Sequence, residues 1–306
     1  MAVAPMSGVT DEAFRLMLLK HGRPDVFWTE FVPVDGLFSK GRKIFIETLK
    51  FKEAEHPIVA QVFGSDPELF EKAAKMIKSM KFDGIDINMG CPDRDVEKRR
   101  AGAALIKNPS LAKQIIRATR KGAGRMPVSI KTRIGYEKDQ IKEWIPVLLK
   151  ENINALTVHF RTRNEKYKSL THWELAQKIV KLRNSLSSET LIIGNGDIKS
   201  LKEAHALAKK TGLDGIMIGR GVLEDPWFFS ENNPVINERL LAIMDHIKVF
   251  ERLNKSRNFN NVKKYFKGYI TGFLGAKNLR DNLMRAKSVI EVESIINDFK
   301  NKYKKI

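Results

Sequence analysis

The sequence predicts an α/β protein: a (β/α)8 TIM barrel followed by a small all-helical C-terminal domain. Two observations support this fold class. Short apolar runs alternate with segments of helical spacing over roughly the first 220 residues. No further run of strand type follows Asp225–Trp227. We therefore expect the barrel domain over residues 1–232 and the helical domain over residues 233–306.

The predicted strands are eight short apolar runs, several of them rich in Val and Ile, as buried parallel strands are. They are Ala2–Ala4, Val26–Phe31, Pro57–Phe63, Asp83–Asn88, Pro127–Lys131, Asn154–His159, Thr190–Gly194 and Asp214–Ile218. An open, doubly wound sheet is the alternative arrangement. Eight strands without an antiparallel hairpin signal favour a closed barrel.

The segments between these runs carry apolar residues at helical spacings of three and four. Capping side chains and early prolines indicate helix starts at Thr10–Glu12, Ser65–Glu68 and Asn108–Ser110. After a linker at Ser230–Pro234, amphipathic helices are expected at Leu240–Leu253, Val262–Leu274, Leu279–Arg285 and Val289–Phe299. We expect the aromatic residues Tyr265, Phe266, Tyr269 and Phe273 to form helical core rather than stack on bases.

The composition indicates a protein that is attracted to polyanions. Lys and Arg number 55 against 36 Asp and Glu, a net charge of +19. Residues 237–306 carry 16 of these basic residues and seven acidic ones, a net +9 at about three times the charge density of the preceding chain. Nucleic acid is the first partner to consider, although such charge can serve solubility alone.

Other compositional features limit where the protein works. No apolar run is long enough to span a bilayer, and the N-terminus lacks a signal-peptide pattern. The single cysteine excludes an internal disulfide, which fits a reducing compartment. We expect a cytoplasmic protein without a membrane partner. We also expect a monomer, because no large apolar surface stripe is apparent.

In a barrel, reactive groups lie at the carboxyl ends of the strands. The residues at or just after those ends, most of them polar, are Pro5, Met6, Glu30, Gln61, Asn88, Cys91, Lys131, His159, Asn195, Asp197, Gly219 and Arg220. The last two runs end in Asn195–Asp197 and Gly219–Gly221, where barrels commonly bind phosphate through backbone amides. A phosphorylated cofactor or substrate is the expected ligand.

Three side chains of this set admit more than one interpretation. Cys91, in the turn Asn88–Pro92, is either a reactive thiol or a small buried hydrophobe. Lys131 is suited to an anion or an electron-rich ring, or to a Schiff base. His159 is a structural residue, a site residue or a partner of a cysteine nucleophile. A metal site is disfavoured, because no second ligand lies at metal-binding spacing.

Nine motifs give the chain a family resemblance. They are Ala4–Asp11, Thr29-Glu30 with Asp35–Leu37, Gln61–Gly64, Asp86–Pro92, Ala101–Leu105, Lys131–Arg133, His159–Thr162, Asn195–Asp197 and Gly219–Gly221. In content and order the chain resembles the tRNA-dihydrouridine synthases, flavin enzymes that reduce uridine in tRNA. Asn88–Pro92 with Ala101–Leu105 is the most specific pair. The segment Lys263–Tyr269 with Leu279-Arg280 is similar to the family's helical tRNA-binding domain. The charged segment Asp93–Arg100 and Phe160 depart from the family pattern.

The resemblance implies a role for each candidate residue. Pro5, Met6 and Ser7 would lie along the ring of FMN, Gln61 and Lys131 would bond its polar edge, and His159 would lie over the ring system. Its phosphate would bind Asn195, Gly196, Asp197, Gly219 and Arg220. Asn88, Arg133 and Arg161 would bind the flipped-out uracil and its tRNA. Reduced flavin would deliver hydride to carbon 6, Cys91 would protonate carbon 5, and NADPH would supply the electrons.

Chemistry supports the same assignment from another side. Reducing the double bond develops enolate-like charge, which a general acid stabilises, and a thiol is largely protonated at neutral pH. Two alternatives stay open: a flavin barrel that reduces a small enone or pyrimidine, and an RNA-binding or tRNA-folding protein without catalysis. The basic tail argues against the first, and the complete strand-end set argues against the second.

Overall fold

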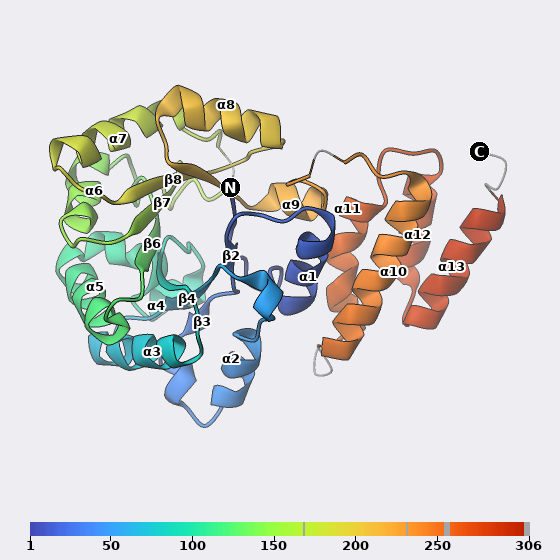
Figure 1. Cartoon of the computed structure of the whole chain (residues 1–306), viewed down its shortest axis with the longest axis horizontal. Helices are drawn as coiled ribbons and strands as arrows, with labels where there is room; N and C mark the ends of the chain where they lie inside the picture. Colours follow the sequence, from blue (N-terminus) through green and yellow to red (C-terminus); the bar gives the residue numbers. More distant parts are fainter. Residues whose placement is uncertain (168, 231, 254–257, 303–306) are drawn as a thin grey trace. The chain divides into compact units, whose positions relative to one another are not determined.

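All eight predicted runs form strands of one parallel sheet in the computed structural model of the chain (Figure 1). The structure describes every residue except 168, 231, 254–257 and 303–306. The strands are β1 (Ala2–Val3), β2 (Phe27–Trp28), β3 (Val32–Pro33), β4 (Ile58–Phe63), β5 (Gly84–Met89), β6 (Val128–Arg133), β7 (Ala155–His159), β8 (Leu191–Asn195) and β9 (Gly215–Ile218). Both β2 and β3 pair with β4, so they occupy one position of the barrel.

The sheet closes on itself almost completely, which confirms the barrel over the open sheet. Its strand order is β1-β9-β8-β7-β6-β5-β4-β2, and a parallel bridge between Ala2 and Val26 joins the two ends of this order. In the register of the pairing, Lys131 lies beside Asn88, and His159 lies beside both Arg133 and Asn195. The predicted site residues of the central strands are therefore level with one another at the carboxyl end.

Helices follow most strands of the barrel and cover its outer surface (Figure 1). They are α2 (Arg42–Thr48), α3 (Pro67–Ser79), α4 (Arg94–Lys98), α5 (Pro109–Ala123), α6 (Ile141–Leu149), α7 (Ala176–Ser185) and α8 (Leu201–Thr211), with short 3-10 turns η1 (Gly36–Phe38), η2 (Glu53–Glu55), η3 (Gly102–Lys107) and η4 (Trp173–Leu175). The predicted capping residues are confirmed. The Asp66 carboxylate accepts from the N–H of Glu68, and Asn108 Oδ1 accepts from the N–H of Leu111.

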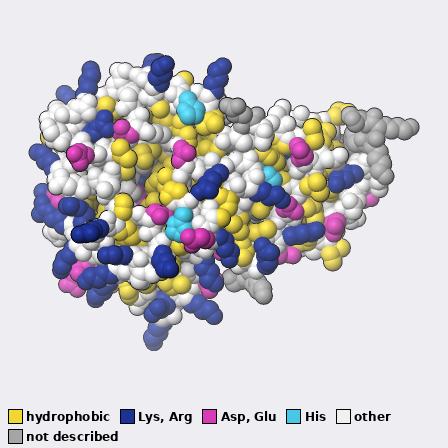
Figure 2. All heavy atoms as spheres, in the orientation of Figure 1, with side chains coloured by type: hydrophobic (Ala, Val, Ile, Leu, Met, Phe, Trp, Pro, Cys, Tyr) yellow, Lys and Arg dark blue, Asp and Glu magenta, His cyan; other side chains and the backbone are white. Residues whose placement is uncertain are grey.

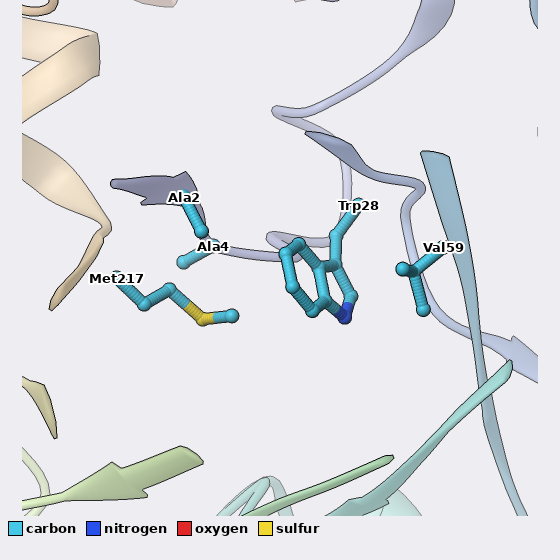
Figure 3. Packing of buried hydrophobic residues seen from close by; sticks show 5 residues of the cluster. All are labelled: Ala2, Ala4, Trp28, Val59 and Met217. Carbon is cyan, nitrogen blue, oxygen red and sulfur yellow. The ribbon is translucent and has the colours of Figure 1, made fainter. Parts of the chain in front are cut away.

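An apolar cluster fills the barrel between its first, second and last strands. The indole of Trp28 lies between Val59 on one side and Ala4 and Met217 on the other (Figure 3). Ala2 completes the cluster, and all five residues are buried. Small side chains on β1 leave room for the Trp28 ring, so the β1 sequence supports the core as well as the site that follows it.

The contacts divide the chain into two compact units that do not follow chain order. One unit contains residues 1–7 and 25–219, and the other contains residues 8–24 and 220–306. The second unit contains α1 (Glu12–His21), α9 (Arg220–Glu224), α10 (Ile236–Leu253), η5 (Phe259–Tyr265), α11 (Phe266–Tyr269), α12 (Ala276–Arg285) and α13 (Val289–Lys302). The predicted boundary at residue 232 separates a catalytic domain from a tRNA-binding domain, and this functional division stays a prediction.

Helix α1 belongs to the second unit because its apolar face packs there. Phe14 stacks on Tyr265 at 4.8 Å between ring centroids and on His246 at 5.9 Å. Its predicted start is confirmed, with the Asp11 carboxylate accepting from the N–H of Phe14 at 2.9 Å. The helix was predicted correctly from the sequence, but it was assigned to the barrel because it follows the first predicted strand.

The C-terminal segment is helical as predicted, with one difference. The helix expected over Val262–Leu274 is instead η5 and α11, and it ends at Tyr269. Gly272 and Gly275 adopt positive φ angles of +79° and +81°, which a continuous helix does not tolerate. The predicted core role of Tyr265, Phe266 and Tyr269 is confirmed, since all three are buried, and Phe273 packs against Phe299. Residues 232–234 of the expected linker have no helix or strand, and Glu231 lies outside the described residues.

Basic side chains are spread over the surface of both units in the face shown in Figure 2. Acidic side chains are fewer and interspersed among them, as the net charge of +19 requires. Across the described part of the chain, none of the helices combines the length and the apolar character of a membrane span.

Candidate active site

The turn after β5 holds Cys91 through its backbone. The Asn88 side chain folds back over this turn, and its Oδ1 accepts hydrogen bonds from the N–H groups of Gly90 at 3.1 Å and Cys91 at 2.9 Å. The carbonyl of Cys91 accepts from the N–H of Ala103 at 3.0 Å. The N–H and the carbonyl of Cys91 are therefore both paired, which fixes the position of its Cα and Cβ atoms.

Gly102 lets the motif Ala101–Leu105 lie directly against this turn. Its φ is +61°, and a Cβ added there would lie 2.8 Å from the Cys91 carbonyl oxygen and 3.3 Å from the Cys91 Cβ. A side chain is excluded both by the backbone conformation and by the space. The motif that carries the most specific resemblance is, physically, the support behind the cysteine.

The Cys91 side chain is a free thiol, partly exposed. Together with Phe31 it packs against an apolar cluster of Phe63, Val96 and Ala101. Burial raises the pKa of the Cys91 thiol, and a backbone hydrogen bond from Asp93 only partly opposes this effect. The side chain is therefore protonated at neutral pH, as an acid must be.

A buried carboxylate orients the side chains beside the cysteine. Asp86 accepts hydrogen bonds from Gln61 Nε2 at 2.6 Å and from Ser129 Oγ at 2.5 Å. The Gln61 Oε1 in turn accepts from Asn88 Nδ2 at 2.9 Å. Because a carboxylate only accepts, each amide has one allowed orientation, and the chain of bonds ends on the turn that holds Cys91.

Asp86 and Lys131 supply opposite charges at the same end of the barrel. Burial raises the pKa of Asp86 to about 6, against the opposing effect of its hydrogen bonds and of Lys131. Burial lowers the pKa of Lys131 to about 8, with Arg133 adding to the effect. The Lys131 ammonium donates to Asn195 Oδ1 at 2.9 Å, and Asn195 Nδ2 donates to the carbonyl of Met217 at 2.8 Å.

The two predicted substrate arginines are buried and bonded within the chain. Arg133 donates through Nε to the carbonyl of Gly90 at 2.7 Å and through Nη1 to that of Thr162 at 2.9 Å. Arg161 donates to the carbonyl of Ser169 and to the carboxylate of Asp197. Their guanidinium groups thus order the loops after β5, β7 and β8.

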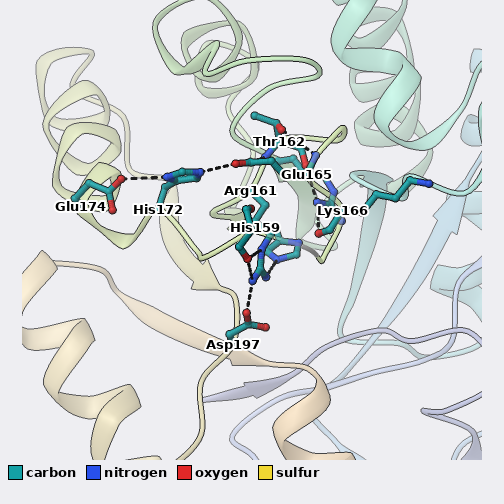
Figure 4. Close-up of polar contacts among 10 residues, drawn as sticks. His159, Arg161, Thr162, Glu165, Lys166, His172, Glu174 and Asp197 are labelled. Atoms are coloured by element: carbon teal, nitrogen blue, oxygen red, sulfur yellow. Dashed lines mark hydrogen bonds and ion pairs between the residues drawn. The ribbon is translucent and has the colours of Figure 1, made fainter.

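His159 lies among the same loop residues (Figure 4). Its Nε2 faces Arg161 Nη1 at 3.4 Å. A guanidinium group only donates, so this nitrogen is the acceptor of the ring. The structure thus places His159 beside Arg161, which is itself bonded to Asp197.

Two residues of the loop after β7 form a separate pair that stabilises it (Figure 4). Glu165 accepts from the N–H of Thr162 and from His172 Nε2, both at 2.7 Å. Burial alone would raise the pKa of Glu165, but these hydrogen bonds lower it to about 2. The same pairing raises the pKa of His172, which favours the charged imidazolium beside the Glu165 carboxylate.

The ends of β8 and β9 give a mixed result for the predicted phosphate site. Gly196 has φ +140°, and a Cβ there would lie 2.5 Å from Thr171 Cγ2, so packing within the chain already requires this glycine. At Gly219 a Cβ would meet Ala4 Cβ and Met6 Sδ only at 3.9 Å, an ordinary contact. The described contacts of the chain therefore do not require a glycine at position 219.

The remaining predicted residues follow β1, β8 and β9. Pro5 is buried, Met6 is half-buried and Ser7 is exposed. Asp197 has a positive φ of +49° and is bonded to Arg161. Arg220 is exposed, at the first position of α9 in the second unit.

Comparison with known proteins gives the family. The family model described as "Dihydrouridine synthase (Dus)" matches residues 2–304. The chain belongs to the dihydrouridine synthase family. It is 40% identical over 303 residues to the "Probable tRNA-dihydrouridine synthase" of Staphylococcus aureus strain Mu50, covering 97% of this chain and 92% of that protein. It is also 40% identical over 307 residues to the "Probable tRNA-dihydrouridine synthase 2" of Bacillus subtilis strain 168, covering 98% and 94%.

Solved structures agree with the barrel fold of this dihydrouridine synthase family member. The old yellow enzyme homologue from Zymomonas mobilis superposes with a TM-score of 0.52 at 14% identity, covering 74% of this chain and 86% of that one. Morphinone reductase in complex with tetrahydroNAD gives 0.53 at 13% identity, covering 77% and 88%. At these identities the likeness concerns the fold alone.

The structure of this dihydrouridine synthase family member joins six of the fifteen predicted site residues into two bonded groups. Gln61, Asn88 and Cys91 form one, around Asp86, and His159, Arg161 and Asp197 form the other. Sequence reasoning missed Asp86, although a carboxylate inside an otherwise apolar strand was a usable signal. It also missed Glu165 and His172, whose pairing only the fold creates.

Proposed function

We propose that this protein is a tRNA-dihydrouridine synthase that reduces the carbon 5–carbon 6 double bond of a uracil in tRNA. The observation that carries the proposal is the protonated, partly exposed thiol of Cys91, held by its backbone at the carboxyl end of the barrel. The names of the related proteins support the same substrate and product.

The residues present suit FMN as the cofactor. The Lys131 ammonium uses one of its three hydrogens on Asn195, and the Gln61 amide has a further N–H beyond the one on Asp86. These donors suit the electron-rich edge of a flavin ring, and Pro5, Met6, Ser7 and His159 would contact the ring. Asn195, Gly196, Asp197, Gly219 and Arg220 would hold its phosphate.

Bound in its reduced form, FMN would be the source of a hydride for carbon 6 of the uracil, and NADPH would supply the electrons. Cys91 donates its thiol proton to carbon 5 and becomes a thiolate, which takes a proton back from solvent. The raised pKa suits this role, because the thiol keeps its proton until negative charge develops on the substrate. Asn88 orients the turn so that the thiol reaches its target.

Arg133 and Arg161 have a different proposed role from direct pairing with the substrate. Their guanidinium groups are bonded to backbone carbonyls and to Asp197. We propose that they order the loops that face the RNA. Attraction of the RNA falls to exposed basic residues, which are dense between positions 237 and 306. Contacts between these residues and the RNA phosphates help to offset the cost of extruding a base, roughly a few kcal/mol.

The first test combines a visible spectrum with an activity measurement. The purified protein, supplied with FMN and NADPH, is incubated with a tRNA transcript, and the gain of two hydrogens on uridine is followed by mass spectrometry. We expect flavin absorption bands and turnover in the wild type. In Cys91→Ala we expect the same bands with turnover reduced about 10²- to 10⁴-fold, the usual contribution of a general acid.

Four results would contradict the proposal in different ways. A protein that shows no flavin bands after reconstitution excludes the cofactor chemistry. Full turnover by Cys91→Ala excludes the acid role of the thiol while leaving the family membership unchanged. Reduction of free uridine but not of tRNA would favour a small-molecule reductase. Tight tRNA binding without reduction would favour the non-catalytic interpretation.

A further inference from the structure

The charged segment after Cys91 forms the short helix α4, which has two differently used sides. Val96 is buried in the apolar cluster against which the Cys91 side chain packs. The next residue, Glu97, carries a side chain that is 11% exposed and pairs with Arg163 of the loop after β7. The helix therefore covers the thiol on one side and bonds to a distant loop on the other.

The contact between Glu97 and Arg163 has several bonds and little solvent. Arg163 Nε lies 2.9 Å from both carboxylate oxygens of Glu97, and Nη2 bonds the same carboxylate. The Arg163 side chain is 18% exposed. A shielded ion pair with several hydrogen bonds contributes more than the usual surface pair, because water competes less for the charges.

Tyr136, in the loop after β6, joins the same cluster. The Lys107 ammonium lies 3.8 Å from the centre of its ring, and the Arg163 guanidinium lies 5.3 Å away. Burial and hydrogen bonding to Glu97 raise the pKa of the Tyr136 hydroxyl. The Arg163 N–H donates to the carbonyl of Gly135 at 2.9 Å, so the backbones of the two loops are bonded as well.

We infer that Glu97, Tyr136 and Arg163 form a clamp that holds α4 over Cys91 and so positions the thiol for proton donation. The loops after β5, β6 and β7 meet in this cluster, and Arg133 adds bonds to Gly90 and Thr162 beneath it. Glu97 and Arg163 are positioning residues, since neither has a contact with the Cys91 side chain among the described interactions. The catalytic part of this inference rests on the proposed function.

The single cysteine allows a direct test of the clamp, because alkylation of a thiol in this chain reports on Cys91 alone. Iodoacetamide labelling of the full chain is followed by intact mass for the wild type, Glu97→Gln and Arg163→Lys. Both variants keep the approximate size of the side chain and remove the ionic or bidentate part of the contact. We expect labelling to be at least about tenfold faster in each, the ratio that loss of a charged hydrogen bond gives.

Asp95→Asn is the matched control. Asp95 lies on the same helix, two residues before Glu97, and its exposed carboxylate pairs only with Lys98 among its described interactions. The substitution removes the same charge and changes the attraction to RNA equally, but it leaves the clamp unchanged. Labelling is measured from about pH 6 to pH 10, so that the pKa and the accessibility of the thiol are fitted separately.

The outcomes separate the clamp from the proposed function. Faster labelling in Glu97→Gln and Arg163→Lys but not in Asp95→Asn, with a lower kcat and an unchanged KM for tRNA, supports the inference. Faster labelling of the two variants in a protein that reduces no uridine supports the clamp and refutes the function. Wild-type labelling rates in folded variants overturn the clamp. Circular dichroism establishes folding, and the conservative Arg163→Lys keeps the test valid if Glu97→Gln unfolds.

Discussion

Gly102→Ala tests how tightly the motif behind Cys91 depends on a missing side chain. Two penalties act at this position. The φ of +61° is a left-handed conformation that costs alanine about 1–2 kcal/mol. The new Cβ would also lie 2.8 Å from the Cys91 carbonyl oxygen and 2.8 Å from Val96 Cγ1, closer than real Cβ contacts. Overpacking of this kind costs about 1–3 kcal/mol.

The sum predicts that Gly102→Ala lowers the free energy of unfolding by about 2–5 kcal/mol. Gly212→Ala provides the matched control, because Gly212 ends α8 with a left-handed φ of +73° and ψ of +19°. A Cβ at position 212 would meet only Val180 Cγ1 at 3.7 Å, an ordinary contact. This variant should lose only about 1–2 kcal/mol, the backbone cost alone.

Urea unfolding, followed by tryptophan fluorescence, measures both free energies under one set of conditions. The difference between the variants isolates the clash with Cys91 and Val96. Relief of that clash must move the Cys91 turn, so Gly102→Ala should also change the rate at which iodoacetamide labels the thiol. Equal losses of stability in both variants, with unchanged labelling, would refute the reasoning that the motif supports the cysteine.

Three further predictions follow from the charges of the site. The folded pKa of Asp86, about 6, lies above its ordinary 3.8, so its stabilising effect is complete below pH 3.8 and is lost as the pH rises through 6. The wild type should therefore lose up to about 3 kcal/mol relative to Asp86→Asn between pH 4 and pH 7, and a constant difference in urea unfolding would contradict this. The pKa of His172 is raised by Glu165, so the stability that His172 contributes over His172→Gln is complete below pH 6.5 and disappears as the pH rises through the raised value. Solvent screening limits that contribution to below about 1 kcal/mol, and thermal melts at pH 6 and pH 9 measure it. Affinity for tRNA should fall by about 10³-fold or more between 50 and 200 mM salt, and a flat response in a filter-binding titration would remove the basic residues from the binding surface.

The sequence predicted the barrel well because its signals are local. Each strand is a short apolar run. At two helix starts, the side chains of Asp66 and Asn108 accept hydrogen bonds from backbone N–H groups of the first turn that follows them. The polar residues at strand ends, such as Lys131 and Asn195, were predicted to be neighbours because parallel strands place their carboxyl ends together. The structure joins these two by a hydrogen bond of 2.9 Å.

Long-range packing decided what the sequence left undetermined. Helix α1 has the periodicity of any barrel helix, and its packing in the second unit, including the stacking of Phe14 on Tyr265 and His246, assigns it there. The helix expected through Leu274 ends at Tyr269, and left-handed glycines follow it at positions 272 and 275. In a contact between distant segments, such as that of Phe14 with Tyr265, the sequence around one residue does not indicate which residue it will meet.

The sequence by itself therefore indicated the kind of site to expect: a barrel whose strand ends carry a cysteine, a lysine and glycine-containing turns that are predicted to bind phosphate. Only the tertiary structure decided what holds Cys91. Asp86 orients Gln61 and Asn88, Gly102 admits the backing motif, and Glu97 reaches Arg163 from a segment whose charge had no explanation in the sequence. The reason is physical: residue types reveal which groups are available, whereas hydrogen bonds and close packing depend on distances that only the folded chain sets.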